Sequence, residues 1–342
     1  MTLVRFALLL ALTQPMARAM EALPKVVPVP ADNPQTPAKI ELGKTLYFDP
    51  RLSVDATVSC NSCHNVMAAG EDGRPVGVGV RGQRGGRGSP TVWNSAFHTV
   101  QFWDGRAASL EEQAKGPLTN PIEMGMPNHD AVMARVKTIP GYVAMFKAAF
   151  PKDADPVTID NLAKAIASFE RTLITPDSAF DLYKRGNKKA MSEAAVRGMK
   201  LVEEIGCTAC HTGPNFAGEG LKMGEGNYQP FPQIPGSKYD KQYDLLSDKG
   251  RFEVTKDKED MHKWRVPTWR NVAVTAPYFH NGKVRTLDEA VRVMAKTQLD
   301  QDLTEAQVGD IVAFLNALTG KFPKITAPQL PLLVNDTLTP EP

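Results

Sequence analysis

The chain has 342 residues, of which 42% are hydrophobic and 23% are charged, and its formal net charge is +2. This length accommodates two domains of ordinary size. The near-neutral charge argues against nucleic acid or an anionic membrane surface as a main partner.

The first residues have the pattern of a secretory leader. Arg5 precedes an apolar run over residues 7–13, and Ala17 and Ala19 fit the small-residue pattern of a cleavage site. We therefore predict a signal peptide over residues 1–19. The apolar run is far shorter than the roughly 20 residues that span a bilayer, so no membrane span is expected.

All four cysteines lie in two copies of a Cys-x-x-Cys-His frame. The frames are Cys60, Cys63 and His64 in the first copy and Cys207, Cys210 and His211 in the second. On a helical turn, positions i, i+3 and i+4 share one face, so two thiols can bond to the vinyl groups of a haem while the imidazole ligates its iron. The frames predict two covalently bound c-type haems, with both histidines as proximal ligands.

Three other uses of these frames are less consistent with the sequence. A zinc site needs four ligands, and the frames lie 147 residues apart. A thioredoxin-like redox pair would need a βαβ context, which the sequence does not show. Two local disulfides would leave the adjacent histidine unexplained in both frames.

The chain also repeats itself outside these frames. Segments 89–113 and 266–290 align without a gap at an offset of 177 residues. Segments 165–174 and 310–319 match at an offset of 145 residues, and both have apolar residues at helical spacing. These repeats indicate an internal duplication. We expect a mainly α fold class, with two cytochrome c-like domains that carry one covalent c-type haem each.

The repeats suggest boundaries for these domains. The expected units are the signal peptide 1–19, a first haem domain 20–174, a second haem domain 175–320 and a proline-rich C-terminal tail 321–342. The halves differ by two insertions. We predict that residues 218–262 form a surface loop and that residues 114–151 begin as a loop and become helical around 131–150.

The sixth coordination position decides whether a haem relays electrons or binds a small molecule. In the second half, Met294 in the helix expected over 287–294 is a candidate sixth ligand, although methionine is also a common core residue. In the first half, the glycine-rich segment 74–88 contains no side chain that would ligate iron. We expect an open position there, with His98 or His129 as alternative ligands.

An open haem that handles peroxide needs a distal acid–base group. Glu123, in the first insertion, is a candidate for moving the proton, and Gln113 is a candidate for orienting the peroxide. By sequence alone, Glu123 is equally consistent with a solvated loop acid.

From about Pro37 to Leu318 the chain resembles the bacterial dihaem cytochrome c peroxidases. The matching strings are CNSCHN, PTVWNSAF, QFWDGRAASLEEQAKGPLTNPIEM, CTACHTGPNF, RVPTWRNVAVTAPYFHNG and LDEAVRVMAKTQL. The resemblance implies a periplasmic homodimer that reduces hydrogen peroxide to water. Its implied electron donor is a small monohaem cytochrome c or a cupredoxin.

The resemblance also implies roles for single residues. The first haem would be the low-potential peroxidatic one, and the second would be the high-potential haem with Met294 as sixth ligand. Glu123 and Gln113 would form the distal catalytic pair. Trp103 would lie between the haems and help electrons to cross, and His280 would have a structural role near the second haem.

Two positions depart from the family pattern. Many members have a histidine on the glycine-rich loop that caps the first haem until the enzyme is reduced, and this chain has Val80 there. We therefore expect the first haem to be open even when both irons are ferric. The interdomain calcium of the family uses an asparagine where this chain has Gly88, so a calcium held by the carbonyls of Thr275 and Pro277 would bind more weakly.

Two alternatives to a peroxidase remain at this point. One is the related dihaem enzyme that matures the tryptophan tryptophylquinone cofactor of methylamine dehydrogenase. That group uses a tyrosine as the distal ligand of its second haem, whereas this chain reads VRVM over residues 291–294. The other is a dihaem electron carrier without catalysis, which would have two six-coordinate irons.

Overall fold

A computed structural model describes residues 20–218 and 220–333. It is mainly helical, which confirms the predicted fold class at that level. The predicted signal peptide lies outside the described residues. None of the described helices combines the length and the apolar character needed to cross a membrane.

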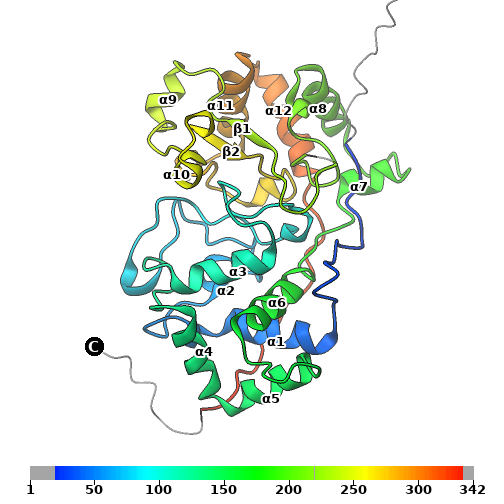
Figure 1. Cartoon of the computed structure of the whole chain (residues 1–342). Coiled ribbons are helices and arrows are strands. Elements are labelled where there is room, and N and C mark those ends of the chain that lie inside the picture. Colours follow the sequence, from blue (N-terminus) through cyan, green and yellow to red (C-terminus); the bar gives the residue numbers. More distant parts are fainter. Residues whose placement is uncertain (1–19, 219, 334–342) are drawn as a thin grey trace, which may run out of the picture.

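The helices form two groups, which lie one above the other in Figure 1. The first half contains α1 (Pro37–Phe48), α2 (Cys60–Cys63), α3 (Leu110–Thr119), α4 (His129–Lys137), α5 (Pro140–Ala149) and α6 (Ile159–Glu170). The second half contains α7 (Ala179–Lys184), α8 (Glu193–Glu204), β1 (Tyr228–Pro230), α9 (Lys238–Gln242), α10 (Phe252–Thr255), β2 (Lys263–Arg265), α11 (Leu287–Leu299) and α12 (Glu305–Asn316). Strands β1 and β2 pair antiparallel, with Tyr228 opposite Arg265.

Each half is built on one pair of closely packed helices, α1 with α6 and α8 with α12. A Cβ atom on Gly43 in α1 would lie 1.8 Å from the carbonyl oxygen of Ala165 in α6. A Cβ atom on Gly198 in α8 would lie 1.9 Å from the carbonyl oxygen of Asp310 in α12. Both contacts therefore require glycine, because a side chain would separate the backbones.

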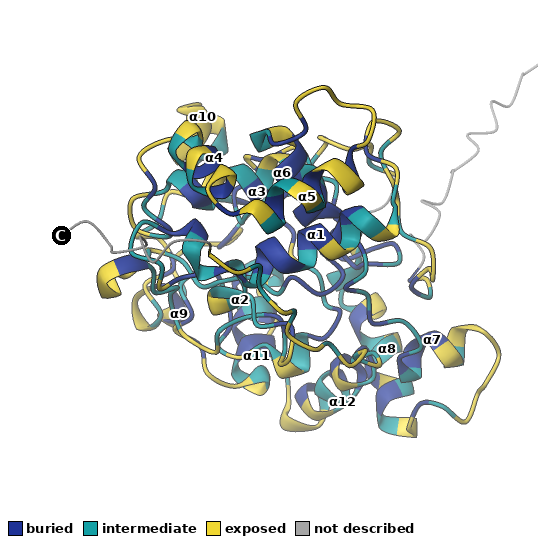
Figure 2. Ribbon diagram, turned by 90° about the horizontal axis from the view of Figure 1, so that it is seen from below, coloured by how far each residue is buried: buried dark blue, intermediate teal, exposed yellow. Residues whose placement is uncertain are grey.

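Local sequence explains where α6 and α12 begin. The side chains of Thr158 and Thr304 accept hydrogen bonds from the backbone at the start of α6 and α12, respectively. The apolar residues expected at helical spacing face the core, as the dark inner faces of the helices show in Figure 2. These buried residues are Leu162, Ile166, Phe169, Leu173, Val308, Ile311, Leu315 and Leu318.

The repeated segments have the same backbone geometry. Asn94 and Asn271 both adopt the left-handed conformation, with φ of 65° and 61°. Asparagine tolerates this conformation better than most residues. Their side-chain amides both donate to Oγ1 of Thr175, at 2.8 and 2.9 Å, and so hold the connection between the halves from both sides.

Both insertions contain more structure than their sequences suggest. Segment 218–262, predicted as a surface loop, includes α9, α10 and β1 and contributes Phe231, Tyr239 and Leu245 to a buried cluster with Trp264. Single apolar residues assemble this cluster, so no periodic pattern predicts it. Segment 114–151 does not begin as the expected loop, because residues 114–119 belong to helix α3. The helical region expected around 131–150 is divided into α4 and α5, because Pro140 begins a new helix.

The beginning of the described chain contacts the second half before it reaches α1. Met20 packs into the core that contains Phe180 and Phe216. The backbone N–H of Leu23 donates to the Asp181 carboxylate at 2.8 Å. This N-terminal segment therefore joins the two halves.

The C-terminal tail crosses between the halves as well. After α12 it runs back along the first half, as the red end of the ribbon shows in Figure 1. Phe322 packs edge-on against Trp93, with ring centroids 5.1 Å apart. Further on, the Pro331 carbonyl accepts a hydrogen bond of 2.9 Å from Arg51. The described part of the tail is thus attached to the first half.

Candidate active site

The first Cys-x-x-Cys-His frame begins on the short helix α2. The Nδ1–H group of His64 donates to the Pro90 carbonyl at 2.8 Å, which leaves Nε2 for a metal. The hydroxyl of Tyr47 donates to the His64 carbonyl at 2.7 Å. Burial lowers the pKa of His64, so the imidazole is neutral, as a metal ligand must be.

The second frame has the same arrangement, although its cysteines lie on a 3-10 turn (Cys207–Ala209) instead of an α-helix. The Nδ1–H group of His211 donates to the Phe216 carbonyl at 2.9 Å. Its ring stacks on Trp269 at a centroid distance of 4.3 Å. Burial lowers the pKa of His211 to about 4. Both histidines are therefore neutral and oriented by a backbone carbonyl.

A cavity of about 540 Å³ adjoins the second frame. Cys207, Cys210 and His211 line it, and Met294 on α11 lines it too. The cavity is mostly apolar, and it combines two cysteines, one oriented imidazole and one thioether. These groups fit a c-type haem, which needs two thiols and one or two axial ligands.

The alternatives to haem attachment are not supported by the geometry. Cys60, Cys63 and Cys207 form no disulfide. Burial raises the pKa of Cys60 to about 12, whereas a reactive redox thiol needs a lowered pKa. Within the described ranges, no group of three or more His, Cys, Asp or Glu side chains is arranged to hold a metal ion.

The cavity extends from the second frame to the first half of the chain. Trp103 lines it, and its indole Nε1–H donates to the Gly88 carbonyl at 2.8 Å. The Trp103 carbonyl accepts from the backbone N–H of Arg265 at 2.9 Å. Pro90, whose carbonyl orients the first histidine, lines the same cavity. Trp103 is therefore in contact with both halves.

The residues considered for calcium lie on this cavity too. Gly88, Thr275 and Pro277 all line it. The backbone N–H of Gly88 donates to the His280 carbonyl at 2.8 Å, and the His280 ring stacks on Trp264 at 4.1 Å. The fold brings these positions together, and it places His280 near the second frame as expected.

Glu123 lies close to the first frame. The sulfur of Cys63 is 3.9 Å from the Val78 carbonyl, and the backbone N–H of Val80 donates to the Glu123 carbonyl at 2.9 Å. The glycine-rich loop therefore connects the frame to the loop that carries Glu123. Burial raises the pKa of Glu123, and the positive charge of Arg106 opposes this shift in part.

Gln113 lies on α3, half-buried, on the segment that leads to Glu123. Among the described contacts, its side chain makes no hydrogen bond to Glu123. The hydrogen bond to Glu123 comes from Asn120 instead, whose side-chain amide donates to the Glu123 carboxylate at 3.0 Å. Sequence reasoning missed Asn120, although an asparagine three residues before an acid at the end of a helix is a typical turn signal.

The alternative ligands of the first haem are engaged elsewhere. His98 contacts Arg265 and Asn215 of the second half. His129 lies at the start of α4, where its Nε2–H group donates to the Lys115 carbonyl at 3.0 Å. Val80, where the resemblance implies that many relatives have a capping histidine, is fully buried in the core of the first half.

Known proteins with similar sequences cover almost the whole chain. A family model described as di-haem cytochrome c peroxidase matches residues 37–189. The chain is 43% identical to cytochrome c551 peroxidase of Pseudomonas aeruginosa, across 98% of this chain and 96% of that protein. It is 40% identical to cytochrome c551 peroxidase of Nitrosomonas europaea, across 95% of this chain and 93% of that protein. Among solved structures, a MauG-like protein associated with microbial copper homeostasis is similar with a TM-score of 0.76 and 31% identity, across 87% of this chain and 95% of that one.

Proposed function

The chain belongs to the di-haem cytochrome c peroxidase family, and we propose that it works as a peroxidase whose two haem sites have different tasks. As a cytochrome c peroxidase, it reduces hydrogen peroxide to water. When bound, the haems supply the redox chemistry, in which peroxide takes up two electrons and two protons and leaves as two water molecules. Two observations support this division of tasks. The glycine-rich loop beside Cys63 hydrogen-bonds to the Glu123 backbone, and Met294 lines the cavity of the second frame.

The matched geometry of the halves supports two haem domains that arose by duplication. Each half has an imidazole oriented by a carbonyl, a helix pair in contact at a glycine, and an asparagine in the left-handed conformation. We propose that residues 20–174 and 175–320 are these domains, each with one c-type haem. His64 and His211 would be the proximal ligands, and Met294 would be the second axial ligand in the second domain.

Electrons are proposed to arrive at the second site, where a thioether ligand favours electron transfer. Trp103 would carry charge between the sites. Its indole lines the cavity of the second site and bonds to Gly88, only two residues from Pro90. Core packing is a second role of the same side chain, since Trp103 also contacts the cluster around Trp264.

Glu123 is proposed to move the proton at the first site. Its carboxylate would take a proton from the near oxygen of peroxide and deliver it to the leaving oxygen. Burial raises its pKa toward the working pH, which suits a group that both accepts and donates a proton. Asn120 fixes one carboxylate oxygen, and Gln113 is the proposed group that orients peroxide.

We propose that the first site is open to peroxide in the fully oxidised protein. Val80 takes the place of a capping histidine, and its buried side chain and its bond to the Glu123 carbonyl hold the loop in place. Reductive activation would then be unnecessary. A low-spin, bis-histidine spectrum of the first haem in the ferric protein would contradict this proposal.

The setting of the protein is proposed from the sequence. The signal peptide over residues 1–19 would direct it to the periplasm, where it would act as a homodimer. Its electron donor would be a small monohaem cytochrome c or a cupredoxin. Calcium would bind through the carbonyls of Thr275 and Pro277, weakly because Gly88 offers no side-chain ligand.

The role of Glu123 is tested by the variant Glu123→Gln. We expect peroxide-dependent oxidation of reduced cytochrome c to fall by roughly 10²–10⁴-fold, the usual contribution of a general acid–base. The pKa of Glu123 is raised, so this carboxylate is protonated at a higher pH than an exposed glutamate. Wild-type activity should therefore already decline at that higher pH when the solution is acidified. The variant should lack this pH dependence.

The matched control is Glu112→Gln, which removes an exposed acid from helix α3, the helix that precedes the Glu123 loop. It should keep wild-type turnover. If Glu123→Gln turned over at the wild-type rate, Glu123 would not be the proton carrier. If the wild-type protein showed no turnover in any redox state, the electron-carrier alternative would be favoured.

The cofactor-maturation alternative predicts a different second site. That enzyme type has a tyrosine as distal ligand, whereas this cavity presents the Met294 thioether. An absorption spectrum of the second haem without the signature of sulfur ligation would favour the maturation type.

A further inference from the structure

Arg265 in β2 is a buried arginine without a carboxylate partner among the described residues. The residue is only 6% exposed to solvent. Nε donates to the Phe102 carbonyl at 3.1 Å, and Nη1 donates to the Val266 carbonyl at 3.3 Å and to Nδ1 of His98 at 3.0 Å. All of these acceptors are neutral, so the positive charge is not compensated.

The other buried arginines of the described chain have carboxylate partners. Arg270, five residues further on, contacts Asp181 at 2.7 Å, and both side chains are completely buried. Arg171 contacts Glu111 at 2.7 Å. A desolvated cation without a partner costs free energy, which is why buried arginines are normally paired. Arg265 is the exception in this part of the chain.

Nearby titratable groups do not remove the charge. Asp104 forms ion pairs with Arg87 at 2.6 Å and Arg106 at 2.9 Å. Tyr228, opposite Arg265 in β1, is neutral because burial raises its pKa. Burial lowers the pKa of Arg265 to about 10, so the guanidinium remains protonated at neutral pH.

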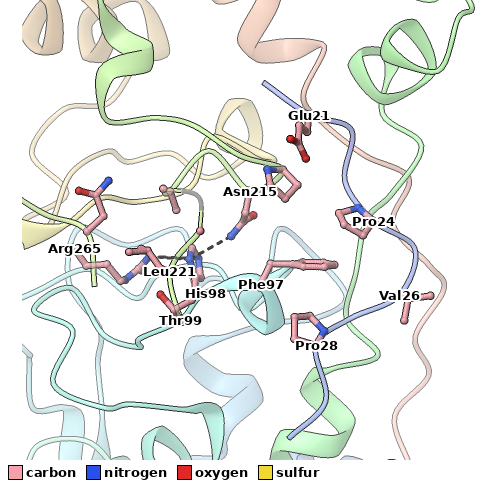
Figure 3. Close-up of a pocket in the computed structure, with 15 residues that line it drawn as sticks. Glu21, Pro24, Val26, Pro28, Phe97, His98, Thr99, Asn215, Leu221 and Arg265 are labelled. Atoms are coloured by element: carbon pink, nitrogen blue, oxygen red, sulfur yellow. Dashed lines mark hydrogen bonds between the residues drawn. The ribbon is translucent and has the colours of Figure 1, made fainter. Parts of the chain in front are cut away.

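A neutral histidine supports the guanidinium from one side. Nδ1 of His98 has two neighbouring donors, Nδ2 of Asn215 at 3.2 Å and Nη1 of Arg265 at 3.0 Å (Figure 3). Two donors meet at Nδ1, so this nitrogen accepts and the ring proton is on Nε2. Burial and the charge of Arg265 lower the pKa of His98 well below its usual range. His98, Asn215 and Arg265 also line a cavity of about 620 Å³.

Arg265 also lines the cavity beside the second frame. Arg265 lines that cavity together with both cysteines and the histidine of the second frame. Among its described lining residues, the only other Lys or Arg is Arg74, which is exposed on the first half. The hydrogen bonds of Arg265 use Nε and Nη1, so Nη2 is available to a further acceptor.

We propose that Arg265 binds a propionate of the second haem and that His98 and Asn215 position its guanidinium for this contact. A c-type haem has two propionates, and an arginine fork matches a carboxylate in charge and shape. The inference rests on the proposed function only in requiring a haem at His211. In this proposal, a propionate of the cofactor provides the negative charge that compensates the buried guanidinium.

The reduction potential of the second haem tests the proposal. In Arg265→Met the propionate loses its counter-charge, which favours the ferric state. We expect the ferric–ferrous equilibrium to change on the order of tenfold, about 59 mV toward lower potential. The uncompensated propionate should also take up a proton more readily, so the variant potential should fall with rising pH across the neutral range while the wild-type potential stays nearly constant.

The matched control is Arg270→Met, which removes a buried arginine that has its own carboxylate. It should lower stability and leave the potential of the second haem unchanged. Equal shifts in both variants, or no shift in Arg265→Met at any pH, would overturn the proposal. Potentials are measured without peroxide, so a failure of peroxidase activity does not affect this result.

A structure of the wild-type holoprotein gives a test that does not depend on variant folding. A propionate oxygen within hydrogen-bond distance of the Arg265 guanidinium is expected. Two propionates that both point away from Arg265 would overturn the proposal.

Discussion

At the scale of single residues, two acids near Arg171 have opposite environments. Burial would raise the pKa of Glu111, but hydrogen bonds from Arg171 and Asn33 lower it overall. Glu170 has a buried carboxylate oxygen without a partner, and burial raises its pKa to about 8. The repeat at an offset of 145 residues places Leu315 at the equivalent position, so this acid belongs to the first half alone.

Glu170→Gln should change stability in a pH-dependent way. Below pH 4.5 the acid is protonated in the folded and unfolded states, so it does not affect the free energy of unfolding. Between pH 4.5 and about 8 only the unfolded state ionises, so wild-type stability is lost as pH rises through this window. The variant should therefore have a higher urea midpoint than the wild type at pH 8 and a similar midpoint at pH 4.5.

Glu111→Gln is the control, because it removes the partner of buried Arg171. It should destabilise the protein at pH 7 by roughly 3–5 kcal/mol, as expected when a buried pair is broken. If Glu170→Gln raised the urea midpoint by the same amount at pH 4.5 and pH 8, the Glu170 carboxyl would not titrate in this window.

At the scale of secondary-structure elements, the contact between α8 and α12 depends on the absence of one side chain. Gly198→Ala would place a Cβ atom 1.9 Å from the Asp310 carbonyl oxygen. We expect a loss of roughly 1–3 kcal/mol in the free energy of unfolding, because the helices must separate. Chemical unfolding followed by circular dichroism measures this change.

Gly309 on α12 is the matched control. It is exposed, and a Cβ atom there would meet nothing within 4 Å. Gly309→Ala should stabilise the protein by roughly 0.5–1 kcal/mol, through lower backbone entropy in the unfolded state. If both alanine variants had the same stability, the close approach of α8 and α12 would not be the reason for glycine at position 198.

At the scale of the whole molecule, two terminal segments join the halves. The N-terminal segment begins beside Phe216 and continues to α1, and the tail leaves α12 and packs Phe322 against Trp93. The relative position of the halves matters for function, because the cavity of the second site is lined by residues of both. These segments are therefore expected to stabilise the arrangement in which Trp103 contacts both halves.

Phe322→Ala should weaken the attachment of the tail. The ring is half-buried, so we expect a loss of roughly 1–3 kcal/mol, less than the 3–5 kcal/mol typical of a fully buried phenylalanine. Unfolding followed at the absorbance of the first haem measures the loss. Leu332→Ala is the control, because this residue is 80% exposed, and it should not change the free energy of unfolding. Equal losses of stability in the two variants would contradict a specific role for Phe322.

Sequence by itself determined those features that depend on local spacing. The cysteines and histidine of each frame are at most four residues apart, so a shared ligand could be predicted from their spacing alone. The helices α6 and α12 were predictable because their apolar faces and threonine caps are local signals. The repeats made the mainly helical architecture predictable as well.

Tertiary structure alone decided which distant groups meet. The carbonyl of Pro90 orients His64, and Arg265 has a neutral histidine as neighbour instead of an acid. The tail that begins at residue 321 packs on the first half. No local pattern contains these contacts, because burial and long-range packing determine them, and they also determine the charge that each site presents to its cofactor.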